Sequence, residues 1–87
     1  MPQISCFYGI TIRMYWNERD HPVPHFHAEY AGEGASVAVD GKLLAGSLPP
    51  RALRLVEDWA KLHRDELLDN WQRAREHEPM ARIDPLP

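Results

Sequence analysis

Three of the five histidines in this chain lie within one short segment, residues 21–27. The segment has the sequence HPVPHFH, so His25 and His27 are two positions apart. In a β-strand, residues two apart point to the same face of the sheet. Histidine changes its charge near neutral pH and is the commonest metal ligand. The pair therefore indicates a site for acid–base chemistry or for metal binding.

The first interpretation is acid–base catalysis on a phosphodiester such as RNA. His25 and His27 would act as general acid and general base, and Arg13 would hold the phosphate. Glu29 continues the same alternation as the two histidines. The candidate catalytic residues are therefore His25, His27, Arg13 and Glu29. No longer sequence motif accompanies them, so the residue types alone do not decide whether the protein is an enzyme.

The second interpretation is a site for a divalent metal such as zinc. Two histidines on one strand face can bind a single ion, but a third ligand is needed. Glu29 lies about 13 Å along the strand from His25, too far to share the ion easily. His21 is the nearest alternative, and His63 is more distant in the sequence. The predicted metal ligands are therefore His25, His27 and His21.

These side chains must be positioned by strands in the first half of the chain, where apolar residues alternate with period two. Residues 4–16 are predicted to form one half-buried strand, with Gly9 bending it or forming a bulge. Turn sequences at residues 32–34 and at Asp40-Gly41 separate the elements that follow. The further predicted strands cover residues 25–31, 35–39 and 43–45.

The apolar pattern also predicts how the first two strands pair. Their apolar sets must share one face, because a shift by one residue would bury the polar set. The register that satisfies this condition places Arg13 opposite His27 and Thr11 opposite Glu29. Tyr15 then falls on the same face, which is predicted to be the open one.

The third strand is expected to pair with the second in the same way. We expect Ala38 beside His27 and Ser36 beside Glu29. The small side chains of Ala38 and Ser36 would leave room around the polar residues on the open face, which is therefore the candidate site.

Helical periodicity replaces the alternation from residue 47 onward. A single helix over residues 50–76 would be about 40 Å long, whereas a domain of this size has a radius of gyration of roughly 12 Å. We therefore expect two helices with a break near His63, and Asp65 as the cap of the second helix. Trp59 and Trp71 lie on the apolar stripes and are predicted to be core residues.

Composition restricts the class of protein. The 87 residues are 44% hydrophobic and 26% charged, which is typical of one small soluble domain. The net charge of −3 provides no general basic field for nucleic acid. The single cysteine, Cys6, excludes an internal disulfide, and its place in the alternation predicts a buried small hydrophobe. No membrane-spanning segment or signal peptide is predicted, so we expect a cytoplasmic protein.

The predicted fold is an α+β domain, with a small antiparallel sheet of three to four strands and two C-terminal helices packed on one face. A single domain is expected over residues 1–87. It divides into a sheet at 1–46, helices at 47–77 and an extended tail at 78–87. In the tail, Ile83 and Leu86 either dock on the surface or fray with it.

The sequence resembles an uncharacterised bacterial family, domain of unknown function number four-one-six-zero. The resemblance rests on residues 2–15, on the PHFH stretch at 24–27 and on the segment from Leu48 to Trp71. Genes of this kind resemble one half of small two-gene operons that are proposed as toxin–antitoxin-like pairs. The resemblance implies a small protein partner encoded by the neighbouring gene, and it supplies no catalytic residues.

Two function classes follow from the sequence. The first is a cytoplasmic interaction protein, one component of a toxin–antitoxin-like pair, which binds its partner through the His/Arg face or through a sheet edge. A homo-oligomer is compatible with this class. The second is a small ribonuclease-like or metal-dependent hydrolytic toxin that acts on RNA through the face carrying His25 and His27.

Overall fold

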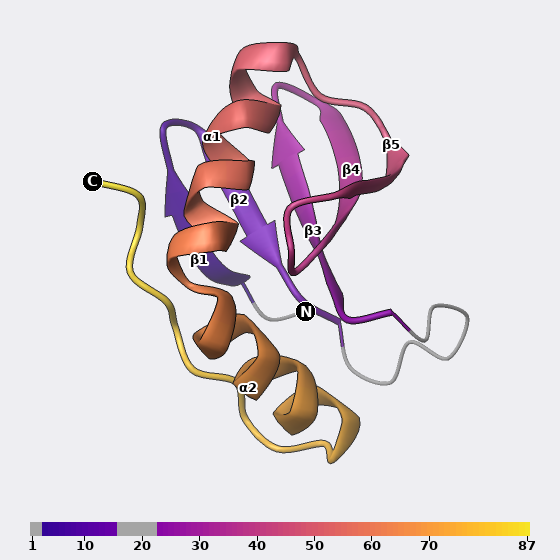
Figure 1. The fold of residues 1–87 in the computed structure, drawn as a ribbon, viewed down its shortest axis with the longest axis vertical. Helices are drawn as coiled ribbons and strands as arrows, with labels where there is room; N and C mark the ends of the chain where they lie inside the picture. Colours follow the sequence, from indigo (N-terminus) through magenta and orange to yellow (C-terminus); the bar gives the residue numbers. More distant parts are fainter. Residues whose placement is uncertain (1–2, 16–22) are drawn as a thin grey trace.

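The computed structural model describes residues 3–15 and 23–87. The chain forms an antiparallel sheet in which the strands follow one another in chain order, and two helices come after it (Figure 1). The α+β prediction is confirmed, with five strands in place of three to four. The elements are β1 (Gln3–Phe7), β2 (Ile10–Arg13), β3 (His25–Tyr30), β4 (Glu33–Ala38), β5 (Leu43–Gly46), α1 (Pro50–Leu62) and α2 (Arg64–Arg75).

The additional strand arises at the start of the chain, where one bent strand was predicted. A hairpin turns at Tyr8 and Gly9, whose φ angles are 50° and 80°. Two successive positive φ angles are typical of the tight turn whose twist matches a β-hairpin. A Cβ atom at Gly9 would also lie 3.4 Å from the Tyr30 ring. Glycine therefore closes a hairpin at this position, and the prediction of a bend or bulge within a single strand was wrong.

The hairpin and a bulge change which residues of β1 face the core. The pairing between β1 and β2 shifts between Gln3 and Ser5, which marks an irregularity in the ladder. Phe7 is buried and its ring lies 5.3 Å from that of Trp59, whereas Cys6 is exposed. The prediction of a buried Cys6 was wrong, because a bulge shifts the inward-facing set by one residue.

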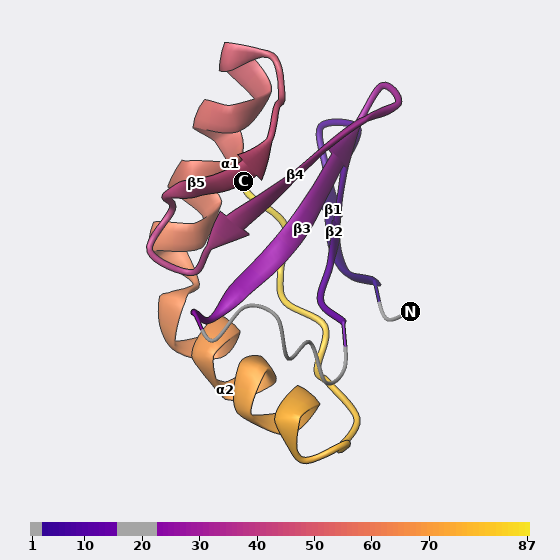
Figure 2. The same ribbon diagram turned by 90° about the vertical axis from the view of Figure 1, so that its right-hand side faces the viewer.

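The main core lies between α1 and one face of the sheet (Figure 2). Trp59 is fully buried there, and its ring contacts that of Phe26 at a centroid distance of 5.5 Å. Trp71 on α2 is also buried, so both tryptophans are core residues as predicted. The fully buried aliphatic residues Ile10, Ile12, Met14, Val37, Val56 and Leu67 complete this layer.

The predicted break between the helices is confirmed. His63 separates α1 from α2, and its Nδ1 lies 2.6 Å from Glu66 Oε1. His63 itself occupies the N-cap position of α2 and makes no side-chain cap hydrogen bond. Asp65 therefore lies within the first turn of α2, where the helix dipole stabilises a carboxylate. Its predicted role as the cap was wrong. Within the described residues, neither helix is long and apolar enough to cross a membrane.

The tail after α2 is extended and lies along β1. The Ile83 amide donates a hydrogen bond to the Ile4 carbonyl at 2.8 Å, and the Ile83 side chain is only 4% exposed. Leu86 packs against the core nearby. At the end of the tail, the Tyr8 hydroxyl donates to the Pro87 carbonyl at 2.8 Å. The tail is therefore docked along its length, as one of the two alternatives predicted.

Both helices also hold the tail, through its main chain. The side chain of Asn70, only 1% exposed, accepts a hydrogen bond from the Ala81 amide at 2.9 Å and donates one to the Ala81 carbonyl at 2.8 Å. The Trp59 indole N–H donates to the Asp84 carbonyl at 2.8 Å. Hydrogen bonds from both helices thus fix the path of the tail. These bonds go to main-chain groups of the tail and not to its side chains.

Candidate functional site

The candidate site lies on the face of the sheet opposite α1. The register between β2 and β3 agrees with the prediction at Arg13 opposite His27 and at Thr11 opposite Glu29. Alternation then directs Arg13, His27 and Glu29 away from the apolar layer under α1. We call the surface formed by Arg13, Tyr15, His27, Glu29 and Ser36 the polar face.

The register between β3 and β4 differs from the prediction by two residues. Ser36 lies opposite His27, and Glu29 lies opposite Gly34. The predicted neighbour of His27, Ala38, instead pairs with His25. A shift of two residues keeps every side chain on the same face of the sheet, so the apolar pattern could not reveal the error.

Arg13 and Glu29 form an ion pair across β2 and β3. Arg13 Nε lies 2.7 Å from Glu29 Oε1, and the two side chains are 33% and 52% exposed. Solvent screens a pair at this exposure, so it contributes less than about 1 kcal/mol to folding. Both charges remain within reach of a molecule that approaches the polar face.

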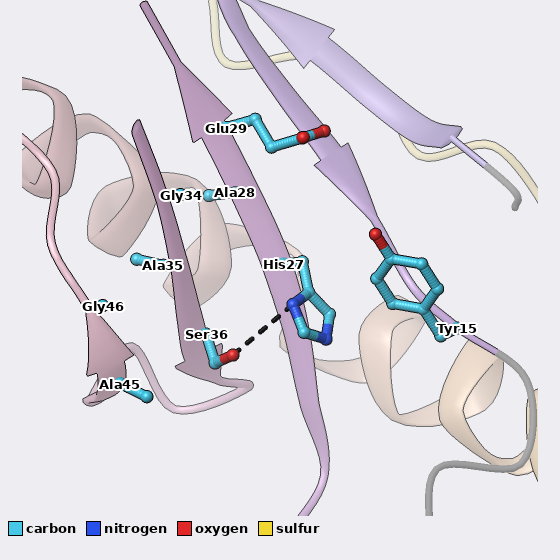
Figure 3. Close-up of a pocket in the computed structure, with 9 residues that line it drawn as sticks. All are labelled: Tyr15, His27, Ala28, Glu29, Gly34, Ala35, Ser36, Ala45 and Gly46. Carbon is cyan, nitrogen blue, oxygen red and sulfur yellow. Dashed lines mark hydrogen bonds between the residues drawn. The ribbon is translucent and has the colours of Figure 1, made fainter. Parts of the chain in front are cut away.

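His27 occupies the middle of the polar face. Its ring meets that of Tyr15 edge to face, with centroids 4.5 Å apart. On the other side, the Ser36 hydroxyl lies 3.4 Å from His27 Nδ1 (Figure 3). Sequence analysis had placed Ser36 beside Glu29, and the corrected register brings it to His27 instead. The imidazole is therefore held between an aromatic edge and a hydroxyl.

A hollow of about 230 Å³ lies beside His27. Its polar wall comes from Tyr15, His27 and Glu29, whereas small residues of β4 and β5 form the other side (Figure 3). The sequence signal for this hollow is the series of small residues in β4 and at the end of β5. The small residues that line it are Ala28, Gly34, Ala35, Ser36, Ala45 and Gly46.

His25 does not join His27 on the accessible surface, although alternation predicted that it would. Its side chain is 1% exposed, and its ring lies 5.0 Å from that of Trp71 and 5.4 Å from that of His27. Its Nδ1 lies 2.8 Å from the Val23 carbonyl, which can only accept, so Nδ1 carries a proton. The predicted exposure of His25 was wrong because Trp71 of α2 packs against its ring.

The remaining predicted ligand, His21, lies outside the described residues, as does Trp16. Among residues 3–15 and 23–87, no three His, Cys, Asp or Glu side chains come together in a way that would hold a metal ion. The zinc site built from His25, His27 and His21 therefore stays a prediction.

Comparison with protein families matches residues 9–72 to DUF4160, a domain of unknown function. The chain belongs to the DUF4160 family. The match covers β2 to β5, α1 and most of α2, and so it includes the polar face and the hollow of this DUF4160 domain. Neither the comparison with curated proteins nor that with solved structures gives a match.

The chemistry available on the polar face of the DUF4160 domain is that of a recognition surface with one accessible imidazole. His27 can exchange a proton, and Arg13 and Glu29 can each pair with an opposite charge. A mechanism that uses two histidines needs both imidazoles at the substrate. The structure brings His27, Arg13 and Glu29 together on the surface and places His25 beneath it.

Proposed function

We propose that this DUF4160 protein is a cytoplasmic bacterial interaction module, one component of a toxin–antitoxin-like pair. Its polar face binds the small protein encoded by the neighbouring gene. The observation that supports the proposal is the hollow beside His27, which is lined by the Tyr15 ring and by Glu29, the acidic member of the exposed ion pair with Arg13. Tyrosine and arginine are the residue types most often found at the energetic centre of protein interfaces.

The geometry also favours a particular kind of partner surface. The hollow is wide enough for one apolar or aromatic side chain, and its small lining residues present no charge to be desolvated. Glu29 lines the hollow and pairs with Arg13, and both side chains are partly exposed, so a complementary pair of charges on the partner would orient the bound side chain. We therefore expect a protruding apolar residue flanked by charged groups on the partner.

Co-expression with the neighbouring gene product tests this proposal. The tagged chain should co-purify with that product, and Arg13→Glu should weaken the complex by at least about tenfold because it places a like charge against the partner. Arg73→Glu is the matched control. Arg73 forms a comparable exposed ion pair with Asp69 on α2, with Nε 3.1 Å from Asp69 Oδ2.

Two outcomes would overturn the proposal. In one, the neighbouring product fails to bind the natural chain in a titration of the two purified proteins. In the other, Arg13→Glu and Arg73→Glu weaken binding equally, which would place the interface elsewhere.

A small RNA-cleaving toxin is the second candidate, and the position of His27 directly opposite Arg13 favours it. In this proposal, the His27 imidazole transfers a proton and Arg13 holds a phosphate. The purified chain should then cleave RNA, and its induction should arrest the growth of a bacterial host. His27→Ala should abolish both effects while the thermal midpoint stays unchanged. RNA that remains intact with the natural chain would eliminate this candidate.

A further inference from the structure

The two edges of the sheet differ in whether another segment of the chain covers them. At β1, the tail covers the edge, with the Ile83 amide bonded to the Ile4 carbonyl. At β5, all four residues are exposed, including Leu43 at 39% and Leu44 at 36%. Among the described residues, the main-chain groups of Leu43–Gly46 that point away from β4 have no hydrogen-bond partner. The β5 edge can therefore accept another strand.

Sheet edges in soluble proteins usually carry features that prevent such pairing, including charged residues, prolines and bulges. β5 contains no charge and no proline, since its sequence is LLAG. Its pairing with β4 passes from Val37–Leu43 to Ser36–Ala45, so Leu44 forms a bulge. The bulge leaves two leucines side by side at the edge, and it is the one protective feature in this strand.

The sequence of β5 is complementary to itself when two copies run antiparallel. A pairing centred between Leu44 and Ala45 places Leu44 opposite Ala45 of the other copy and Leu43 opposite Gly46. Each large side chain then meets a small one, and no like charges face each other. A strand without charged residues thus suits a second copy of itself.

The hollow adds a second reason for this occupant. Ala45 and Gly46 form its β5 wall. In the antiparallel pairing, these are the residues that lie opposite the leucines of the other copy, and cross-strand neighbours are about 5 Å apart. The leucines of the other copy therefore lie beside the β5 wall of the hollow.

We propose that two copies of this chain associate through antiparallel pairing of their β5 strands. The dimer has one continuous sheet, and in it the leucines of each copy lie beside the hollow of the other. Because the tail covers the β1 edge, the pairing ends at two copies and does not extend into a fibre. The pairing uses the main chain of β5 and not the ion pair between Arg13 and Glu29, so the proposal does not depend on the partner inferred above.

Light scattering after size exclusion tests the dimer directly. The mass should rise from 10.1 kDa towards twice that value as the concentration increases from about 10 μM to about 1 mM, the range expected for a small interface. Leu44→Lys should keep the mass at the monomer value, because it adds the charge that protects natural edge strands. Leu62→Lys is the matched control, since Leu62 is a 60% exposed leucine at the end of α1.

Hydrogen exchange gives a measurement that does not rely on any variant. The amides of Leu43–Gly46 should exchange more slowly at high protein concentration, whereas the amides of α2 should not change. A mass of 10.1 kDa at the highest concentration would overturn the proposal. So would a dimer that Leu44→Lys and Leu62→Lys affect equally, or one that leaves β5 exchange unchanged.

Discussion

The β1 side and the β5 side of the sheet differ in what stabilises them. On the β1 side, the tail buries Ile83 in the core. Its main chain also forms hydrogen bonds with the side chains of Tyr8 in a turn, Trp59 in α1 and Asn70 in α2. On the β5 side, a four-residue strand is bonded only to β4 among the described elements, and all its side chains are exposed. Burial and main-chain hydrogen bonding decide how much an edge contributes to stability. The β1 side is therefore anchored by the tail, whereas the β5 side is open to solvent.

The largest effect is expected from Ile83→Ala on the β1 side. It removes a buried side chain and leaves a cavity, which should lower the free energy of unfolding by about 3 kcal/mol. Urea denaturation followed by tryptophan fluorescence measures the change. Leu68→Ala on α2, where the side chain is 37% exposed, is the control and should cost much less. If both variants lost equal stability, the tail would not be anchored as described.

A somewhat smaller loss, about 2 kcal/mol, is expected for Asn70→Ala. The substitution removes both hydrogen bonds to Ala81 and leaves those main-chain groups without their partner. Gln72→Ala provides the comparison, because the Gln72 side chain donates to the exposed side chain of Glu76, the residue that follows α2. Amide exchange at Ala81 should become faster in Asn70→Ala alone. Unchanged exchange there would show that Asn70 does not hold the tail.

Tyr8→Phe should have a modest effect at the end of the tail. The change deletes the hydroxyl that donates to the Pro87 carbonyl and keeps the ring, so the expected loss is about 0.5–1 kcal/mol. Thermal unfolding of Tyr8→Phe beside Tyr15→Phe measures it. Tyr15 lies on the polar face, and among residues 3–15 and 23–87 it makes no hydrogen bond to the tail, so its variant should match the natural chain.

The smallest effect is expected on the β5 side. Leu44→Lys replaces an exposed side chain at the outer strand and should change the free energy of unfolding by less than about 0.5 kcal/mol. The measurement is urea denaturation at a concentration where the chain is monomeric. A loss comparable to that of Ile83→Ala would remove the contrast between the two sides of the sheet.

Much of the fold follows from the alternation of apolar residues. The pairing of Arg13 with His27 was predicted from a register that sets Ile12 opposite Ala28, and the strands have that register. The pairing of β3 with β4 was not, because a shift of two residues buries the same set. Tyr8 at a positive φ angle also hid the first hairpin, since tyrosine is not among the residues usually found in such turns.

The candidate site was predicted in part, for a related reason. His27, Arg13 and Glu29 reach the surface because their position depends on strand alternation alone. His25 has the same alternation, but it is buried because Trp71 of α2 packs against its ring, and strand alternation does not reveal such a contact. Docking of the tail was predicted only as one of two alternatives. Its partners are main-chain groups of Ala81 and Asp84, which every residue possesses.

The contact between Ile83 and Ile4 has a consequence for how the protein is made. A ribosome synthesises β1 first and the tail much later, so the edge of β1 has no cover while the rest of the sheet and both helices emerge. Contacts between residues so far apart in sequence form slowly, because a long loop must close first. An uncovered strand edge is also a site of aggregation. The nascent chain is thus most vulnerable just before residues 81–86 leave the ribosome, and release of the tail completes the fold.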